Sequence, residues 1–545
     1  MSDARAFATW EEANERFRSP LCCPEPDCGE PIPTLASPPP QGVADRCPKC
    51  GKPFERNSIR TQPGAPPIEI ARRVTAGFCT MTGQELTVPS CLDWAEAGGG
   101  PGRTGCLPDA RGAFFGRPNP NTVIHGALTC RVDDVFGPDR EGADPVRSIL
   151  VVRGRLVVTS AGGRTAILRT EDLSSVLPAG ECLDWPDGTA DAAIDERSVS
   201  QSAAVRGGHL CIVAAHQLAI RDIREYLGRP ARGSRSVMSV VANEDCRFLG
   251  PPLGIDAERP LFAVLEGRDD DADGVLSDPA IRVVDATGTE VSVWDAPGIV
   301  RPPVYDRLNQ VLVWVTETGA MNSVPLAQIL RGGGFPISSE PGGEFSARFD
   351  SRSTLLVAPN LKGWAEVWMA DNHGEEDSFA IWSALLQPRA NPQKYGSNLA
   401  WKWRRRDHDA PSGRINGFAV GQGGGSAADS AADLAAVTSD EGVFGLRKST
   451  KGVLDRDFTD STSGGSIRGS ADPPILCSAG IVARTNLGVY VNSRPVGWSQ
   501  EAGDRFIPLA STERRRQGLA MLGRRVFVGH GTGVVAIDLE PKECG

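Results

Sequence analysis

Short runs of apolar residues separated by glycine-containing turns recur along most of the chain. Near the C-terminus, residues 519–539 contain three apolar segments separated by turns at 523–525 and 531–533. Turns this short join neighbouring antiparallel strands, because glycine readily adopts the positive φ that tight hairpins need. The pattern therefore predicts antiparallel units of three or more strands joined by hairpin turns.

The same unit returns many times. It first occurs at 148–168, where the pattern predicts strands over 148–152, 155–160 and 165–168. Further copies contain the apolar segments 210–213, 261–265, 311–315, 355–357, 434–437, 481–483 and 526–528. Most successive copies lie 43 to 55 residues apart. A period in that range with about four strands per unit is typical of a β-propeller. We therefore expect a mainly β protein with a seven- or eight-bladed β-propeller over residues 110–545, and an array of β-sandwiches is the alternative.

The C-terminal copy, from Val526 to Asp538, resembles blades of the quinoprotein-like and WD-type propellers. The resemblance extends over about residues 110–545, but the motifs that separate the two subfamilies are missing. In closed propellers the last blade is commonly completed by a strand from the start of the domain, so that no sheet edge is left open. We expect residues 68–88, or the region near Val123, to lie beside residues 526–539.

Two pairs of cysteines near the N-terminus form the most specific motif. Cys23 and Cys28 lie in one turn-like segment, and Cys47 and Cys50 lie in a second. Four thiolates delivered in pairs match the tetrahedral shell of structural zinc, whereas free or disulfide-bonded cysteines are the alternative. Residues 21–60 resemble a zinc ribbon, in which the metal folds a module too small to be stable alone. Cys22 could replace Cys23, but Cys23 precedes a proline, as Cys47 does.

Other segments interrupt the repeat. We expect an amphipathic helix within residues 1–20, and a linker with a possible propeller-closing strand over 61–109. About 80 residues separate the segments 355–357 and 434–437, which predicts an insertion at about 371–430 with a short helix over 377–387. The insertion contains a basic and aromatic stretch formed by Trp401, Trp403, Arg404, Arg405 and Arg406. Such residues can anchor a protein interface or stack on bases, and an edge strand with inward-facing tryptophans is the alternative.

Three aspartates, Asp269, Asp271 and Asp273, match the opening of a calcium loop. Alternate aspartates followed by a glycine supply the oxygen ligands and the sharp turn that Ca²⁺ loops use. The glutamate expected at the twelfth position is replaced by Ala280. A solvated acidic hairpin loop is therefore favoured over a calcium site.

Charge and composition narrow the class of partner. The formal net charge of −10 disfavours general nucleic-acid binding, because such proteins need excess Lys and Arg to displace phosphate counterions. No run of 18 apolar residues is present, so no membrane helix is expected. Cysteines scattered at unpatterned spacing fit a reducing compartment, which favours a cytoplasmic protein. The high content of Ala, Gly, Arg and Pro suggests a GC-rich bacterial genome.

Catalytic signatures are sparse. The six histidines fall in different units, without the paired spacing of a catalytic metal site, and no Gly-x-Ser-x-Gly motif occurs. The sequence favours a non-catalytic platform that binds other proteins. By analogy with zinc ribbons elsewhere, it would be an accessory or sensor subunit of a multi-component bacterial system linked to an NTPase or GTPase. The rival is a hydrolase or oxidoreductase with its site at the central channel, where clustered Asp, His and Arg would support it.

Overall fold

The computed structural model of the chain is built almost entirely from β-strands. It describes residues 21–22, 31–32, 45–46, 50, 53–54, 122–137, 145–178, 181–183, 203–214, 216–228, 237–243, 245–255, 260–268, 277–306, 310–332, 336–339, 349, 354–359, 365–372, 379–386, 404–405, 415–421, 434–448, 454–461, 469, 472–477, 480–493, 506–509, 518–522 and 525–543. The described residues contain the five-residue helix α4 (Leu326–Leu330). Among these residues no helix is long and apolar enough to cross a membrane.

The strands from β5 onward form eight antiparallel sheets, numbered here 1 to 8 in chain order. Sheet 1 contains β6 (Val146–Val152), β7 (Arg155–Ser160) and β8 (Thr165–Arg169). Sheet 2 contains β9 (Ala203–Arg206), β10 (His209–Ala214), β11 (Gln217–Asp222) and β12 (Val237–Val241). Sheet 3 contains β13 (Arg247–Ile255), β14 (Leu261–Arg268), β15 (Ser277–Asp285) and β16 (Glu290–Asp295). Sheet 4 contains β17 (Val304–Asp306), β18 (Val311–Val315), β19 (Met321–Pro325) and β20 (Ile337–Ser339).

The second half of the chain repeats this arrangement. Sheet 5 contains β21 (Thr354–Pro359), β22 (Ala365–Asn372), β23 (Phe379–Leu386) and β24 (Arg404–Arg405). Sheet 6 contains β25 (Ile415–Gly421), β26 (Leu434–Ser439), β27 (Gly442–Lys448) and β28 (Leu454–Ser461). Sheet 7 contains β29 (Ile475–Cys477), β30 (Gly480–Thr485), β31 (Gly488–Ser493) and β32 (Phe506–Pro508). Sheet 8 contains β33 (Leu519–Leu522), β34 (Arg525–His530), β35 (Gly533–Glu543) and, from far earlier in the chain, β5 (Thr122–Val132).

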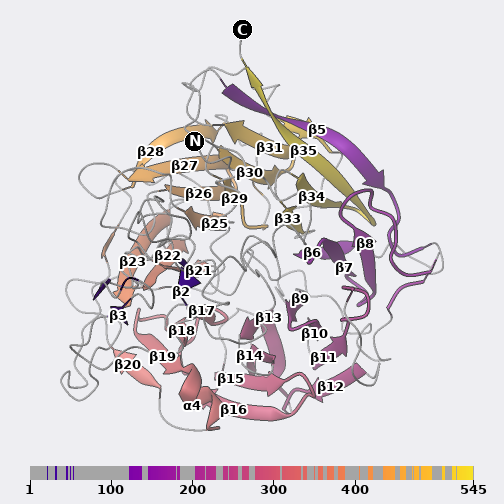
Figure 1. Cartoon of the computed structure of the whole chain (residues 1–545). Coiled ribbons are helices and arrows are strands. Elements are labelled where there is room, and N and C mark those ends of the chain that lie inside the picture. Colours follow the sequence, from indigo (N-terminus) through magenta and orange to yellow (C-terminus); the bar gives the residue numbers. More distant parts are fainter. Residues whose placement is uncertain are drawn as a thin grey trace.

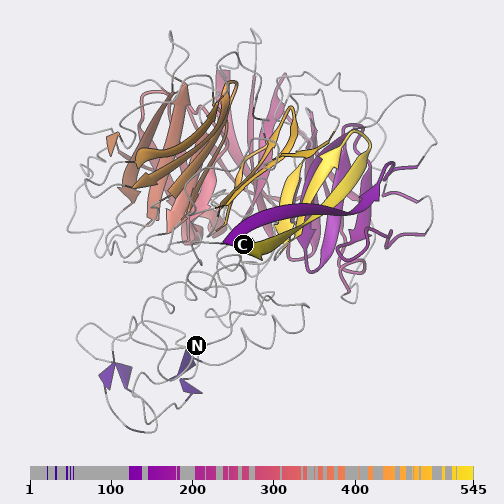
Figure 2. The same cartoon turned by 90° about the horizontal axis from the view of Figure 1, so that it is seen from above.

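The eight sheets surround a common centre in a propeller-like arrangement (Figure 1). The first strand of each sheet lies innermost, and each of these strands contacts the first strands of both neighbouring sheets. The contacts include one between β33 of sheet 8 and β6 of sheet 1, so they run around the whole ring. The last strand of each sheet lies at the periphery, and Figure 2 shows the sheets edge-on.

Local sequence explains the hairpins. Between β6 and β7, Arg153 and Gly154 adopt φ values of 52° and 70°. Two consecutive residues with positive φ make a two-residue turn whose twist matches the twist of the strands, and glycine lowers its cost. The strands predicted at 148–152, 155–160 and 165–168 are confirmed as β6, β7 and β8.

The strand expected to complete the last sheet is β5. It pairs antiparallel with β35 from Val534 opposite Val132 to Glu543 opposite Thr122. The pairing expected between the region near Val123 and residues 526–539 is therefore confirmed. The other candidate for this strand, residues 68–88, lies outside the described residues.

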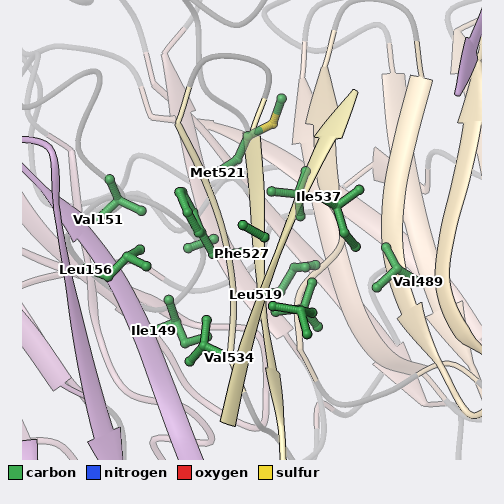
Figure 3. Packing of buried hydrophobic residues seen from close by; sticks show 14 of the residues in the cluster. Ile149, Val151, Leu156, Val489, Leu519, Met521, Phe527, Val534 and Ile537 are labelled. Carbon is green, nitrogen blue, oxygen red and sulfur yellow. The ribbon is translucent and has the colours of Figure 1, made fainter. Parts of the chain in front are cut away.

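The largest buried cluster holds sheet 8 between its two neighbours. Apolar side chains of β33, β34 and β35 pack against β6 and β7 on one side and β31 on the other (Figure 3). The labelled members of this cluster are Ile149, Val151, Leu156, Val489, Leu519, Met521, Phe527, Val534 and Ile537. The first sheet and the last sheet therefore share one core, although the whole repeat region separates them in sequence.

The helix predicted over 377–387 is wrong, because the described residues of this segment, Phe379–Leu386, form β23. Trp382 pairs with Met369 of β22 on one side and with Arg405 of β24 on the other. The Ser383 hydroxyl donates to Glu366 Oε1 at 2.7 Å inside the sheet. Pairing on both edges overrides a local sequence that is compatible with a helix.

The long interval between the apolar segments 355–357 and 434–437 also has an explanation. The first segment lies in β21, the first strand of sheet 5, whereas the second lies in β26, the second strand of sheet 6. Within 371–430, the described residues contribute to β22, β23, β24 and β25, which belong to these two sheets. The other residues of the predicted insertion lie outside the described ranges.

Four two-residue strands precede the ring. β1 (Leu21–Cys22) pairs with β2 (Pro31–Ile32), and β3 (Asp45–Arg46) pairs with β4 (Pro53–Phe54). These hairpins lie apart from the eight sheets, to one side of the ring (Figure 2). The helix expected within residues 1–20 lies outside the described residues.

Candidate functional site

Where the structure describes them, the turns that follow the second strand of a sheet lie on one face of the ring. Antiparallel pairing puts the end of a second strand beside the start of the first, as where Ser160 pairs with Val146. Backbone hydrogen bonds then join this turn to the chain entering the next sheet. Repeating both relationships around the ring keeps these turns on the same side, which we call the turn face.

The same kind of backbone hydrogen bond occurs at four places on the turn face. The acceptor is a carbonyl oxygen of the turn, and the donor is an amide of the chain that leads into, or begins, the next sheet. The pairs are Ala242 to His216 at 2.9 Å, Phe349 to Glu317 at 2.9 Å, Gly469 to Ser439 at 2.8 Å and Val146 to Gly531 at 2.8 Å. The last pair joins sheet 8 to sheet 1 by the same kind of backbone hydrogen bond that occurs between consecutive sheets elsewhere in the ring.

Side chains stabilise the same turns from within. The hydroxyl oxygens of Ser160, Thr316 and Ser439 accept turn amides from Arg164, Ala320 and Glu441 at 2.9, 3.1 and 3.0 Å. The Thr485 hydroxyl accepts the Leu487 amide at 3.2 Å and donates to the Gly488 carbonyl at 3.0 Å. A short hydroxyl side chain can satisfy a turn amide that the ladder leaves unpaired.

These turn hydroxyls have a sequence signal that is separate from the pattern of apolar segments. A Ser or Thr stands three residues before a glycine at Ser160, Thr316, Ser439 and Thr485. In sheet 8 the corresponding residue is His530, three residues before Gly533. Aligning the repeats on the turn glycine, instead of on the apolar strands, would have identified these positions.

A polar cluster lies on the turn face where sheets 7 and 8 meet. Asp472 and Arg484 are 4% and 3% exposed, and their Oδ2 and Nη1 atoms are 3.6 Å apart. Asp472 Oδ1 also accepts the backbone amide of Gly518 at 3.1 Å, just before β33. The Asp472 carboxylate therefore ties sheet 7 to the start of sheet 8.

His530, the last residue of β34, is close enough to Arg484 for the charge of Arg484 to act on its imidazole. Burial lowers the pKa of its imidazole, and the positive charges of Arg131 and Arg484 lower this pKa further, while Asp133 opposes them. Its Nδ1 atom is buried without a hydrogen-bond partner in the described part of the chain. The cluster thus combines a carboxylate, a guanidinium and an imidazole that favours its neutral form.

A second buried charged group links sheets 2 and 3. Arg282 Nη2 lies 2.7 Å from Glu266 Oε2, and both side chains are almost fully buried. Arg282 Nη1 donates to the Val241 carbonyl at 3.2 Å, and the Asn243 amide donates to Glu266 Oε1. Because each charge is matched by a partner from a neighbouring strand or loop, the group acts as a connection between sheets.

Most residues of the predicted metal sites lie outside the described residues. Of the four zinc-site cysteines, Cys50 is described and is exposed, whereas Cys23, Cys28 and Cys47 are not described. Asp269, Asp271 and Asp273 are not described either, but they fall in the hairpin loop closed by the pairing of Arg268 with Ser277. Within the described ranges no group of three or more His, Cys, Asp or Glu side chains is placed to hold a metal.

The basic and aromatic stretch is described only in part. Arg404 and Arg405 form β24, the outer strand of sheet 5, and pair with Ser383 and Trp382. Trp401, Trp403 and Arg406 lie outside the described residues. The backbone of β24 agrees with an edge strand, which was one interpretation of this stretch.

No protein-family model matches the chain, and no curated protein matches it by sequence. Among solved structures it is similar to quinohemoprotein alcohol dehydrogenase from Comamonas testosteroni, with 10% identity, a TM-score of 0.46, and coverage of 86% of this chain and 83% of that one. It is also similar to a europium-containing methanol dehydrogenase, with 10% identity, a TM-score of 0.45, and coverage of 81% and 90%. A third is the β-propeller domain of Cps50 (Swd1) from Myceliophteria thermophila, with 11% identity, a TM-score of 0.37, and coverage of 68% and 100%. Likeness at this level carries no argument about the chemistry of the chain.

Proposed function

We propose that this chain is a non-catalytic protein-interaction platform, built as an eight-bladed β-propeller with an N-terminal zinc ribbon. The observation that carries the proposal is the construction of the turn face. A repeated backbone hydrogen bond holds the turns in place, while the side chains at their tips differ. A rigid frame with variable loops suits protein docking, because little conformational entropy is lost on binding.

The turns of the turn face carry different kinds of side chain at their tips. The turn of sheet 6 carries Asp440 and Glu441, and the turn of sheet 7 carries Leu487, which is 43% exposed. An exposed leucine beside an acidic turn resembles the mixed apolar and charged composition of protein interfaces. The partner we propose is a subunit of the same multi-component bacterial system, linked to an NTPase or GTPase, in the cytoplasm. This partner class rests on the analogy with zinc ribbons.

The zinc ribbon is supported by the backbone around its cysteines. β1 and β2 bracket residues 23–30, which contain Cys23 and Cys28, and β3 and β4 bracket 47–52, which contain Cys47 and Cys50. Two hairpins that each carry a cysteine pair in the turn fit a four-thiolate donor set. Cys22 falls within β1, which favours Cys23 as the ligand. Zinc would stabilise the fold of this module and leave no position for a reacting group.

The experiment compares two exposed leucines. Leu487→Asp changes the turn face, whereas Leu128→Asp changes β5, where Leu128 is 49% exposed on the outer strand of sheet 8. NTPases and GTPases whose genes neighbour the gene of this chain are purified. Their affinities for the wild type and for both variants are measured by calorimetry. We expect Leu487→Asp to weaken binding about tenfold or more while Leu128→Asp has no effect. Binding of none of these proteins by the wild type, or equal binding by all three chains, would contradict the platform.

The Asp472, Arg484 and His530 cluster favours the rival function, an enzyme with its site on this face. Such an enzyme would need a proton acceptor with a pKa below neutral, and His530 offers one. The purified chain is screened with ester, phosphoester and alcohol substrates, and His530→Ser is the paired variant. Turnover by the wild type that falls in His530→Ser, at an unchanged melting temperature, would support the enzyme and contradict the non-catalytic platform.

A further inference from the structure

The facing surfaces of sheets 1 and 2 share an apolar core and are basic at one end. Antiparallel pairing arranges residues in rows across the strands, and the members of a row lie on the same side of the sheet. On sheet 1, Val152, Arg155 and Arg169 form one such row. Val152 belongs to the core cluster that sheet 1 shares with sheet 2, so Arg155 and Arg169 lie on the side of sheet 1 that faces sheet 2.

Sheet 2 places a third arginine at the same junction. Val205, Leu210 and Arg221 form a row, and the first two belong to the same core cluster, so Arg221 lies on the side of sheet 2 that faces sheet 1. Arg169 and Arg221 are near the ends of β8 and β11, which belong to neighbouring sheets (Figure 1). We call Arg155, Arg169 and Arg221 the arginine cluster. It lies at the end of these sheets that is opposite the turn face.

Two members of the cluster are like charges directly opposite each other. Arg155 of β7 pairs with Arg169 of β8, and like charges in such a cross-strand pair destabilise a sheet. Among the residues that the structure describes, Arg155 makes no ion pair. Its Nη1 atom donates to the Gly154 carbonyl at 2.9 Å, and its Nε atom is buried without a hydrogen-bond partner. Because a guanidinium has five N–H donors, most of the donors of Arg155 are left for an acceptor from outside the chain.

Arg169 is only partly matched by the loop that follows β8. Its Nη1 atom donates to the Ser174 hydroxyl at 3.0 Å and to the Ser175 carbonyl at 3.5 Å, and both acceptors are uncharged. Hydrogen bonds from Ser174 lower the pKa of the Asp172 carboxyl, and the charge of Arg169 makes a smaller contribution in the same direction. Asp172 therefore offsets part of the charge of Arg169, while Arg155 is left without an acidic partner in the described part of the chain.

We infer that the arginine cluster binds a phosphate group. A phosphate monoester carries a charge of about −1.5 to −2 at pH 7 and three strong acceptor oxygens, whereas a carboxylate carries a single charge. Planar guanidinium groups bind such oxygens in pairs. Arg169 is exposed and the other two arginines are partly exposed, so a ligand can reach them from solvent. The apolar core beside them lowers the local dielectric constant, which strengthens the attraction. The inference does not depend on the proposed platform function.

The test measures binding of inorganic pyrophosphate to the full-length chain by calorimetry at constant ionic strength. We expect the wild type to bind and the dissociation constant to rise about tenfold or more in Arg155→Gln and in Arg169→Gln, because each loses charged hydrogen bonds to the ligand. Arg331→Gln is the matched control, because Arg331 is an exposed arginine at the end of α4 in sheet 4. A wild type that does not bind pyrophosphate, or equal affinity in all four chains, would overturn the inference.

Thermal unfolding separates lost binding from a folding defect. Without pyrophosphate, Arg155→Gln should unfold no earlier than the wild type, since it removes one of two like charges that lie opposite each other. Pyrophosphate should raise the melting temperature of the wild type more than that of Arg155→Gln, because a ligand stabilises the folded state that binds it. An equal rise in both chains would contradict a role for Arg155 in binding.

Two further ligands define the class of anion and its source. Citrate that binds as tightly as pyrophosphate would overturn the choice of phosphate over carboxylate. A phosphoserine peptide is compared with its unphosphorylated form and with pyrophosphate. Tighter binding of the phosphopeptide would assign the phosphate group to a modified protein, and tighter binding of pyrophosphate would assign it to a small molecule. Because the platform test changes Leu487 on the opposite face, failure of one proposal leaves the other unaffected.

Discussion

The backbone amide of Val146 donates a hydrogen bond to the carbonyl oxygen of Gly531 at 2.8 Å, and this bond joins the first sheet to the last. Two further contacts support the same junction. The Val135 amide donates to the Thr532 carbonyl at 3.0 Å, and β5 pairs with β35 from Val534 to Glu543. The junction between the two ends of the repeat region is therefore distributed over several strands and turns.

Two glycines of this junction make a matched pair for substitution. A β-carbon at Gly533 would lie 2.2 Å from the Val132 carbonyl oxygen, so Gly533→Ala must displace β5. Gly531 has φ of 58° with open space around it, so Gly531→Ala costs about 1–2 kcal/mol of backbone strain and no clash. We expect a lower urea midpoint for Gly533→Ala than for Gly531→Ala. Equal midpoints would show that β5 is not held as closely as the pairing indicates.

Arg525 joins sheets 8 and 1 away from the turn face. Its guanidinium makes two bonds to Asp538 at 2.6 and 2.7 Å and donates to the carbonyls of Thr170 and Glu171 at 2.9 and 2.5 Å. Arg525→Ala leaves these acceptors without their donor, and we expect a loss of about 1–3 kcal/mol in the free energy of unfolding.

The control for Arg525 is Arg131→Ala, because Arg131 pairs with Asp133 where both side chains are exposed. An exposed pair contributes about 0–1 kcal/mol, so this variant should unfold near the wild-type midpoint. Urea denaturation followed by tryptophan fluorescence measures both variants. A loss for Arg525→Ala no larger than for Arg131→Ala would count against a structural role for the Arg525 contacts.

His530 should make stability depend on pH. Its pKa in the folded protein is lowered by burial and by Arg131 and Arg484, so the unfolded chain binds the proton more readily. The contribution of neutral His530 is complete above pH 6.5, the ordinary value. It is lost progressively as pH falls from 6.5 towards the lowered pKa.

The variant His530→Ser introduces the hydroxyl residue found in the corresponding turns of sheets 1, 4, 6 and 7 and removes the titrating group. We expect the difference in urea midpoint between pH 7.5 and pH 5.5 to be smaller for His530→Ser than for the wild type. His209 also has a lowered pKa through burial, so a residual dependence should remain in the variant. An unchanged pH dependence in His530→Ser would assign the effect to other groups.

Zinc should be bound by the four cysteines of the N-terminal hairpins. We expect one equivalent of zinc to copurify with the chain and to be lost in the double variant Cys47→Ser/Cys50→Ser, as measured by atomic absorption. Cys211→Ser is the control, because Cys211 is buried within β10 of the ring. Full zinc content in the double variant would exclude this site.

The repeat pattern predicted much of the ring because hairpins are local. Apolar alternation and turn glycines placed β6, β7 and β8 correctly, and each of the eight copies of the unit lies in a different sheet. The same reasoning failed at β23, where residues compatible with a helix are held between β22 and β24. The candidate site was predicted less well. The turn-face hydroxyls lie outside the apolar runs, and the association of Asp472 with Gly518 depends on how neighbouring sheets meet.

The amino-acid order alone was sufficient for the repeated strand units and for the expectation that an early strand completes the last sheet, because these follow from short-range periodicity and unpaired edges, whereas it left the number of blades at seven or eight. Tertiary structure decided that β5 supplies this strand, in which register, and that the Asp472, Arg484 and His530 side chains share one cluster. Contacts between distant segments depend on packing across the ring, and periodicity along the chain carries no record of them.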